Sequence, residues 1–591
     1  MIEVIISLIY IIAVVFGVGA LGMSLLGRAF GRNLAGRGIT GDSGAKGSSA
    51  KPSGTKMPYG GVRGTFSIMG CLLAGITIIT VYTEYLSIFI KIGAIAHIGM
   101  LLMATAGYYL ERAQIGKMLF DVKKIALSWE GFFYFGVLIL IAFFASRGTF
   151  HTDTNIYHAA SIRIYEEYGV VKGIGNLQSH YAYNSAYFAF AAIFSLNWLL
   201  GHSVHTTTAF LEFISCVYAF YQLRRFKEHG YHMTDLSCVA ILLSVLTILS
   251  GSMSPASDYA TMILLLLVIS LWCRNMEGSR NIYIYGLLSV AGVFIVTVKF
   301  SAAFIVLLAI YPAVLLIKER RGKDILIFLG LGLLSLIPFL VRNFLISGWL
   351  LYPFAGIDIF NVEWKMPYEF LKNDADQIET WGKCLYDVSK VDAPLSEWLP
   401  VWWTEKDRHQ MMLLYGVLVG IVFALVQCVK LFVQKVSIKW EYLLFVVSDI
   451  ACLLVWFFMS PFIRYGRAFI FAIIFIPVGV HLSFRHKGLY SIVGGFLVFL
   501  LFTCAVPYYS NYILESCVFV KQNLTEPYYL SQKRYDDAET GSREINGVTV
   551  YYSMSSDEIN SYYYFPNTCY DDMLDRCTLI GDSVKDGFKT K

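Results

Sequence analysis

The residues best suited to chemistry lie in a short polar stretch, residues 151–158, with the sequence His-Thr-Asp-Thr-Asn-Ile-Tyr-His. The stretch follows a hydrophobic span and precedes an amphipathic, aromatic-rich segment. A carboxylate with histidines nearby can take a proton from a hydroxyl group, so Asp153 and His158 are the predicted catalytic residues. Two simpler roles stay open. Asp153 could cap a helix that begins near Asn155, and the histidines could be ordinary interfacial residues.

Further charged residues stand beside or within apolar spans, where an ionised group is costly and is therefore usually functional or paired. They are Asp258, Lys299, Arg342 and Arg464. An acid, a base and several cations suit a reaction on an anionic, phosphorylated lipid, because lysine and arginine bind phosphate, arginine in a bidentate manner. The alternatives are helix capping for Asp258, snorkelling for Lys299 and interfacial anchoring for the two arginines.

The composition indicates an integral membrane protein. Of its 591 residues, 57% are hydrophobic and 15% are charged, whereas soluble domains have roughly 25% charged residues. The apolar residues form runs near the ~20 that cross a bilayer, and such runs must be helices because lipid offers the backbone no hydrogen bonds. We therefore expect an α-helical polytopic protein with about 13–15 helices. The net charge of +5 is spread over loops, which argues for membrane topology and against nucleic-acid binding.

The expected spans show no internal repeat, and no cysteine–histidine spacing typical of a metal site occurs in the chain. The spans cover residues 3–26, 65–84, 88–109, 126–146, 184–200, 206–223, 235–251, 258–273, 281–297, 300–317, 324–341, 411–434, 441–459, 467–484 and 489–507.

Lysine and arginine in the loops set the orientation, since cytoplasmic loops are enriched in them. The loops expected in the cytoplasm are 27–63, 112–124, 224–227, 318–321, 430–439 and 485–487. Alternation then places two long loops, 147–183 and 342–410, and the tail 508–591 outside, together with the turns at Asp258, Lys299 and Arg464. One segment, 184–200, would invert every later loop if it crossed. It is therefore expected to be re-entrant or interfacial.

Three regions follow from this layout. Residues 1–124 hold the N-terminal helices and a basic, Gly/Ser-rich cytoplasmic linker, and residues 125–507 form the transmembrane core. Residues 508–591 are expected to form a small extracytoplasmic domain of mixed strand and loop. The outer loop 342–410 is rich in tryptophan, which suits the membrane interface or sugar rings.

The tail carries three local signals. Residues 547–552 alternate like a strand. Cys569 and Cys577 are close enough in the sequence for a disulfide outside the cell. Residues 523–525, Asn-Leu-Thr, are a formal glycosylation sequon, which has meaning only in a eukaryote.

Several motifs resemble the bacterial GT-C glycosyltransferase-like membrane proteins. They are Asp-Thr-Asn-Ile-Tyr-His at 153–158, Tyr-Gly-Val-Val-Lys-Gly-Ile-Gly-Asn at 168–176, His180, Asn184-Ser185, Ser-Pro-Ala-Ser-Asp at 254–258, Thr-Val-Lys-Phe-Ser at 297–301, the segment 342–353, Ser-Pro-Phe-Ile-Arg-Tyr-Gly at 460–466 and Asp-Ser-Val-Lys-Asp-Gly-Phe at 582–588. The resemblance spans residues 125–591, implies a GT-C-like fold, and leaves the first three helices as an added module.

In that family an acidic residue of the first outer loop is the catalytic base or a metal ligand, and the donor is commonly a polyprenyl-phosphate sugar. By position, Asp153 matches this acid. The resemblance also implies substrate-binding groups at Asn176, His180, Asn184, Asp258, Lys299, Arg342 and Arg464. The usual pair of adjacent acids is missing, because Thr152 and Thr154 flank Asp153. The resemblance therefore leaves open whether a divalent metal is a cofactor.

The sequence thus predicts a multi-pass protein of a bacterial plasma membrane that transfers a sugar from a polyprenyl-phosphate donor to a glycan or lipid acceptor on the extracytoplasmic face. Lys299 and Arg342 are expected to bind the donor phosphate. A polysaccharide polymerase or ligase, whose lipid donor carries a glycan, fits the same residues. A non-catalytic glycolipid transporter or flippase fits less well, because transporters often have internal repeats and midplane sites.

Overall fold

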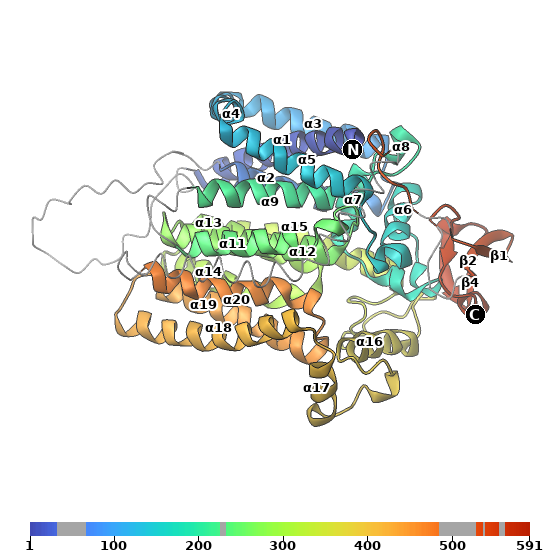
Figure 1. The fold of residues 1–591 in the computed structure, drawn as a ribbon. Coiled ribbons are helices and arrows are strands. Elements are labelled where there is room, and N and C mark those ends of the chain that lie inside the picture. The colour runs from blue at the N-terminus through green and yellow to red at the C-terminus, as the bar shows by residue number, and fades with distance from the viewer. Residues whose placement is uncertain (32–66, 225–231, 484–527, 536–537, 555–561) are drawn as a thin grey trace, which may run out of the picture.

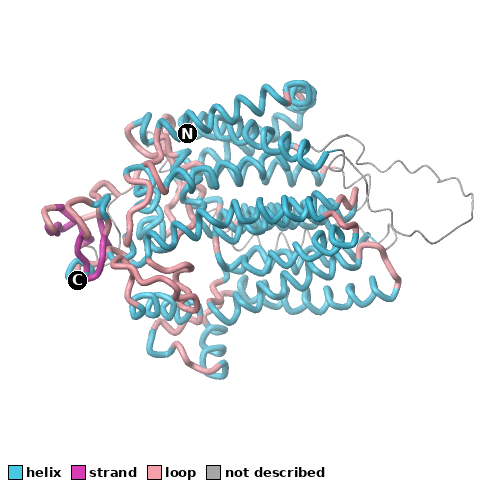
Figure 2. Tube along the Cα trace, turned by 180° about the vertical axis from the view of Figure 1, so that it is seen from behind, coloured by secondary structure: helices cyan, strands magenta, loops and turns pink. Residues whose placement is uncertain are grey.

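A computed structural model describes residues 1–31, 67–224, 232–483, 528–535, 538–554 and 562–591. Most helices run side by side as one bundle, and the strands gather at one end of it (Figure 1, Figure 2). Five features expected from the sequence lie wholly or mostly outside the described residues: the span 489–507, the basic loops 224–227 and 485–487, the linker 27–63 and the sequon at 523–525.

Nine helices in the described part of the chain are long and apolar enough to cross a membrane. They are Ile2–Phe30 (α1), Ile68–Ser87 (α2), Trp129–Arg147 (α5), Ser257–Glu277 (α12), Phe300–Lys318 (η6 with α14), Gly322–Ser347 (α15), Arg408–Val433 (α18), Lys439–Met459 (α19) and Ile463–Val480 within Ile463–Ser483 (α20). Shorter helices of the bundle are Ala94–Leu110 (α3), Thr207–Leu223 (α9), Met233–Leu246 (α11) and Ile282–Val298 (α13). These helices are compatible with the expected multi-pass membrane protein.

Burial divides the bundle into inner and outer helices. α12 lies in the interior and packs against α9, α11, α13 and α20. α15 and α18 instead expose leucine and valine side chains, among them Leu329, Leu333, Val419 and Val422. Extended apolar surfaces of this kind mark the sides of a protein that contact lipid or another protein.

Close backbone contact joins α1 to α2. A Cβ atom added at Gly19 would lie 1.7 Å from the backbone oxygen of Cys71, and one at Gly75 would lie 1.9 Å from that of Val15. Small residues that let backbones approach are common where helices pack in membranes. α3 packs on α1 as well, so the N-terminal helices form one tightly packed group.

Some expected spans are broken. Residues 300–317 were expected to form one helix, but they form a 3₁₀ helix, Phe300–Ala309 (η6), followed by Ile310–Lys318 (α14). The span 235–251 ends in a separate 3₁₀ turn, Leu249–Gly251 (η5). Hydropathy does not distinguish the two windings, because both are made from the same apolar residues. The expected loop 112–124 is a helix, Arg112–Ala126 (α4). With this helix and the short helices of the loops, the described part of the chain has more helices than the roughly 13–15 expected.

The expected outer loop 342–410 is largely structured. It contains Tyr368–Gly382 (α16), Val388–Lys390 (η7) and Leu395–Thr404 (α17). Three of its tryptophans, Trp349, Trp398 and Trp402, are buried inside the protein, so for them the expected place at a membrane interface or sugar ring is wrong. The indole N–H of Trp402 donates a hydrogen bond to the carbonyl oxygen of Pro461, 3.0 Å away, because a buried indole needs an acceptor.

Segment 184–200 is split into Ala186–Phe194 (α7) and Asn197–Leu200 (α8). A nine-residue helix is about 14 Å long, well short of the ~30 Å of a hydrocarbon core, so α7 alone does not cross a membrane. All nine residues of α7 are buried inside the protein, so α7 is not a lipid-exposed span. That the segment is re-entrant or interfacial stays a prediction. Leu196 adopts a left-handed conformation with φ of 57° and turns the chain into the exposed α8.

The described part of the tail and the loop 147–183, which we call the first outer loop after its expected side, form one unit at the end of the bundle. The loop contains the π-helical turn Thr154–His158 (η2), the helix Ala159–Glu167 (α6), and the turns Ile174–Asn176 (η3) and Ser179–Ala182 (η4). The tail contains Thr540–Ile545 (β1), Val548–Ser553 (β2), Asn567–Thr568 (β3), Asp572–Arg576 (α22), Cys577–Leu579 (β4), Val584–Asp586 (η8) and Phe588–Thr590 (β5). The strand expected at 547–552 is confirmed by β2.

In the tail, β2 pairs antiparallel with β1 and parallel with β3, while β4 and β5 form a separate antiparallel pair. Val550 and Phe588 of the tail share a hydrophobic core with Leu177 of the loop. The expected disulfide between Cys569 and Cys577 is absent from the described structure, where Cys577 is a buried free thiol. Sequence proximity did not bring the two thiols together, because α22 intervenes and leads Cys577 into β4.

Candidate functional site

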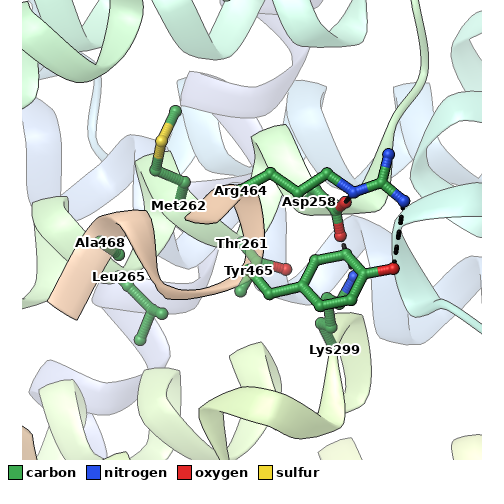
Figure 3. A pocket seen from close by; sticks show the side chains of 8 residues that line it. All are labelled: Asp258, Thr261, Met262, Leu265, Lys299, Arg464, Tyr465 and Ala468. Atoms are coloured by element: carbon green, nitrogen blue, oxygen red, sulfur yellow. Dashed lines mark hydrogen bonds and ion pairs between the residues drawn. The ribbon is translucent and has the colours of Figure 1, made fainter. Parts of the chain in front are cut away.

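Four elements bring charged side chains together where the helices of the bundle meet the first outer loop. The turn before η2 supplies His151 and Asp153, and the first turn of α12 supplies Asp258. Lys299 follows the last residue of α13, and Arg464 lies in the first turn of α20. Figure 3 shows the side chains of Asp258, Lys299, Arg464 and Tyr465 pointing toward one another. We call these residues, with His151 and Asp153, the charged cluster.

The guanidinium group of Arg464 is the centre of the cluster. Its Nη1 lies 2.8 Å from Nε2 of His151, and its Nη2 donates to Oδ2 of Asp153 at 3.2 Å. Nη2 also contacts the hydroxyl of Tyr465 at 3.2 Å, and Nε lies 3.5 Å from Oδ2 of Asp258. One cation therefore joins two carboxylates that belong to distant parts of the chain.

The second cation, Lys299, pairs with Asp258. Its ammonium donates to Oδ1 of Asp258 and also lies over the ring of Tyr465, 3.7 Å from the centroid. Asp258 is only 7% exposed. A buried carboxylate needs compensation, and here Lys299 and Arg464 provide it from opposite sides. The two acids and two cations thus balance each other within the cluster.

The electrostatics keep Asp153 ionised and its histidine neighbours neutral. Burial alone would raise the pKa of Asp153, but the charge of Arg464 outweighs it and lowers that pKa below its usual value. Burial lowers the pKa of His151, and it lowers the pKa of His158 to about 3. The capping role left open for Asp153 receives no support, because its side chain makes no capping hydrogen bond.

His151 faces hydrogen-bond donors on both ring nitrogens. The backbone N–H of Asp153 approaches Nδ1 at 3.1 Å, and Arg464 approaches Nε2 at 2.8 Å. A neutral imidazole has one acceptor nitrogen, so it accepts only one of these bonds fully. His151 therefore cannot satisfy both donors at once.

A small pocket opens beside the cluster. It is lined by Asp258, Thr261, Met262, Leu265, Lys299, Arg464, Tyr465 and Ala468 (Figure 3). Its water-sized volume of about 10 Å³ is close to the space of one water molecule. The pocket admits a water molecule as it stands, and a sugar or phosphate needs its side chains to move apart.

The same residues could ligate a metal ion. Ligand atoms of His151, Asp153 and Asp258 lie within 4.8 Å of one another. Imidazole with two carboxylates is a donor set that suits divalent cations such as Mn²⁺ or Zn²⁺. Arg464 contacts all three of these side chains, so its guanidinium supplies positive charge where such an ion would bind. A divalent metal fits the donor set after Arg464 has moved away.

The structure places His158 behind the cluster. Its Nδ1 lies 3.1 Å from the hydroxyl of Thr154, and its ring centroid lies 6.2 Å from that of His151. It is 2% exposed and packs on Tyr157 and Phe188. His158 therefore supports His151 and Asp153 from inside and makes no contact with the pocket.

Arg342 belongs to a separate, fully buried set of contacts. Its Nη1 donates to Oγ of Ser87 at 2.6 Å, and its Nε donates to Oδ1 of Asn184 at 3.2 Å. Its guanidinium carbon lies 3.9 Å from the ring centroid of Tyr165. Asn184, which was predicted to bind substrate, also donates to the carbonyl oxygen of Phe339 at 3.0 Å. These contacts join α2, the first outer loop and α15.

The two remaining predicted residues also have internal partners. The amide of Asn176 donates to the carbonyl oxygens of Trp364 at 2.9 Å and Phe588 at 3.3 Å, and it thereby ties the first outer loop to the second loop and the tail. His180 packs between aromatic rings, with centroid distances of 5.5 Å to both Tyr157 and Tyr183.

Sequence reasoning missed two residues near these groups. Tyr465 contacts both cations of the cluster, Arg464 and Lys299. Its place next to Arg464 in the sequence was the one signal that could have identified it. Asp374 is buried in α16 and accepts a hydrogen bond from the hydroxyl of Tyr352 at 3.0 Å. Burial raises the pKa of Asp374 although Tyr352 and Tyr183 donate to it. No spacing in the sequence signals this site, because its partners come from separate loops.

Comparison with known proteins adds a family and no function. No curated protein and no solved structure matches the chain. Residues 1–471 match a family described as a domain of unknown function, DUF8201, and the match includes His151, Asp153, Asp258, Lys299 and Arg464. Since it covers well over half of the sequence, the chain belongs to the DUF8201 family.

Proposed function

We propose that this protein is a membrane glycosyltransferase of the GT-C type. It transfers a sugar from a polyprenyl-phosphate donor to a glycan or lipid acceptor on the extracytoplasmic face of the membrane. The observation that carries the proposal is the bridging position of Arg464, which contacts both Asp153 and Asp258 while Lys299 pairs with the latter. Such a cluster offers one acid to act as a base and two cations to hold a phosphate.

The surroundings of Lys299 support a lipid phosphate as the ligand. Lys299 is followed by η6, in which Phe300 is 54% exposed and Phe304 is 40% exposed on the outside of the bundle. A lipid headgroup anchored by a chain on this surface lies next to the ammonium group. Lysine and arginine together stabilise the charge that develops on a departing phosphate.

Arg464 couples donor binding to activation of the acceptor. With Arg464 beside it, Asp153 has a lowered pKa and is a weak base. When the donor phosphate draws the guanidinium away, burial is no longer opposed, so the pKa of Asp153 rises and the carboxylate becomes a better base. Asp153 then takes the proton of the acceptor hydroxyl as that oxygen attacks the anomeric carbon and the phosphate leaves.

We assign Arg342 a positioning role in this scheme. The sequence had suggested it as a phosphate ligand, but its hydrogen bonds to Ser87 and Asn184 are internal and buried. It holds the end of α15 against the first outer loop, so Arg464 replaces it beside Lys299 as the second cation for the phosphate.

Binding of a synthetic polyprenyl phosphate to the purified protein tests the phosphate site. Truncating one partner of a desolvated charged pair typically costs ~2–5 kcal/mol, or roughly thirtyfold and upward in affinity. Native mass spectrometry should therefore show strongly weakened binding for Lys299→Ala and Arg464→Ala, and a partial loss for Lys299→Arg. Lys372→Ala removes an exposed lysine that pairs with Asp376 in α16 and is the matched control. Unchanged affinity in both cluster variants would place the donor site elsewhere.

Transfer itself tests the base. Membranes that contain the protein are supplied with a panel of labelled polyprenyl-phosphate sugars, and transferred label is measured by mass spectrometry. Asp153→Asn should bind the lipid phosphate as the unaltered protein does and transfer no sugar. Turnover at the original rate in this variant would show that Asp153 is not the base.

A further inference from the structure

Helix α4, Arg112–Ala126, does not run with the bundle. Figure 1 shows α4 end-on, whereas its neighbours α1, α3 and α5 are seen from the side, and the view from behind in Figure 2 also shows this helix end-on. α4 therefore lies across the direction of the spans, which is the orientation of a helix in the plane of a membrane surface. It lies at the end of the bundle opposite the strands and the tail.

The two faces of α4 differ in chemistry. Apolar residues recur with helical spacing at Ile115, Met118, Leu119, Val122 and Ile125, and the basic residues Arg112, Lys117, Lys123 and Lys124 lie on the other side and along the rim. Ile115 is the only buried residue of α4. Leu119 is 59% exposed and Val122 is 42% exposed.

The exposed apolar surface continues beyond α4. Leu127 and Trp129 are each 80% exposed, and Phe132 is 65% exposed at the start of α5. Within the described part of the chain, α4 packs on its sequence neighbours α3 and α5, and Ile115 joins a hydrophobic core with Ala20 and Met23 of α1. Leu119 and Val122 remain exposed. Tryptophan is enriched at the boundary between lipid and water, and lysine there can keep its charge in water while its stem lies over apolar groups. The ammonium of Lys124 lies 4.4 Å from the ring centroid of Phe120 in this manner.

We propose that α4 lies in the interface of the cytoplasmic leaflet and binds the headgroups of anionic phospholipids. The exposed apolar side chains between Leu119 and Phe132 insert at the boundary between headgroups and acyl chains, and the lysines along the rim of α4 contact the lipid phosphates. Residues 111–124 hold four basic and two acidic side chains, so the charge complements an anionic headgroup. Helices with an exposed apolar face and a lysine-rich polar face bind membranes in this way. The proposal does not depend on the glycosyltransferase assignment.

Depth-dependent quenching tests the position of α4. The full chain carries a fluorophore on a single added cysteine, Val122→Cys on the apolar face or Gly116→Cys on the polar side, where a Cβ meets no atom within 4 Å. The proteins are placed in nanodiscs that contain a spin-labelled quencher lipid, and the unaltered protein gives the background labelling. Val122 should be quenched strongly and Gly116 weakly. If the fluorophore at position 122 is not quenched, protein from this chain or another copy covers the face. That result would overturn the proposal.

Lipid titration tests the headgroup. Each basic residue near an anionic surface contributes about fivefold in affinity, so the loss of three gives a drop on the order of a hundredfold. Phosphatidylglycerol binding, measured by native mass spectrometry, should fall by that amount in Lys117→Gln/Lys123→Gln/Lys124→Gln. It should not change in the matched control Lys372→Gln/Lys390→Gln/Lys585→Gln, which removes three exposed lysines from α16, η7 and η8 at the opposite end of the bundle. Equal behaviour of the two triple variants would refute a specific anionic site on α4.

Discussion

Replacing Arg464 with methionine should reverse the way in which stability depends on pH. In the unaltered protein the pKa of Asp153 is lowered, so its ionised form contributes stability above the ordinary aspartate pKa, and this contribution is lost as the pH falls below about 4. Without Arg464, burial dominates and raises the pKa of Asp153. Ionised Asp153 then destabilises the fold at neutral pH, and stability should rise as the pH falls from 7.5 toward 5.

The size of the effect follows from the burial of the partners. Removing one member of a buried ion pair costs ~3–5 kcal/mol. The side chains of Asp153 and Arg464 are 22% and 30% exposed, and Asp258 keeps Lys299. We therefore expect the free energy of unfolding at neutral pH to fall by about 2–4 kcal/mol. For a chain of 591 residues this lowers the melting temperature by about 2–3 °C.

Thermal unfolding of the detergent-solubilised protein at pH 7.5 and 5 measures this prediction. Arg467→Met is the matched control, since Arg467 lies one turn later in α20 and donates to the hydroxyl of Thr247. Adding Asp153→Asn to Arg464→Met should restore the neutral-pH melting temperature, because the uncompensated charge is gone. Equal melting temperatures for Arg464→Met and Arg467→Met, with the same pH trend, would refute the view that Arg464 compensates Asp153.

Three further outcomes are expected. Mn²⁺ should raise the melting temperature of Arg464→Ala more than that of the unaltered protein, because this variant leaves the metal-type ligand set open; equal shifts would mean that the guanidinium does not occupy that place. In intact cells an impermeant thiol reagent should label Ser542→Cys in β1 and not Ser437→Cys before α19, with the unaltered protein as background; the inverse pattern would invert the topology. Gly19→Ala should destabilise the protein by about 1–3 kcal/mol through overpacking, whereas Gly27→Ala, with open space at its Cβ, should not, as thermal unfolding will show.

From the sequence we could predict that the charged residues lie at one end of the bundle, but not which of them form ion pairs. Asp258, Lys299 and Arg464 could be placed at one end of the bundle, because each lies at a break between apolar spans and the basic loops set the side. Arg342 lies at such a place too, but the rotation of α15 turns it into the protein, toward Ser87 and Asn184. Helix rotation depends on packing with neighbours that hydropathy does not identify.

The local windings escaped prediction for a different reason. The long apolar run 300–317 has the same composition whether it is an α-helix or a 3₁₀ helix, and only the packing of η6 between α13 and α19 distinguishes them. Asp374 was not recognised because its partner Tyr352 lies in an irregular segment and not on the same helix. By contrast, β2 was predictable, since alternation within six residues is a local property.

The shared core of the tail and the first outer loop also sets an order of events during synthesis. Asn176 and Phe588, which are joined by a hydrogen bond, are 412 positions apart. At a translation rate of about 5–20 residues per second, the loop waits on the order of 20–80 s before its partner strand is made. During that interval Leu177 and Ile174 lack the tail residues that cover them. Chains that terminate before β5 therefore leave Ile174 and Leu177 without these partners, and we expect them to be more sensitive to proteolysis than the full chain.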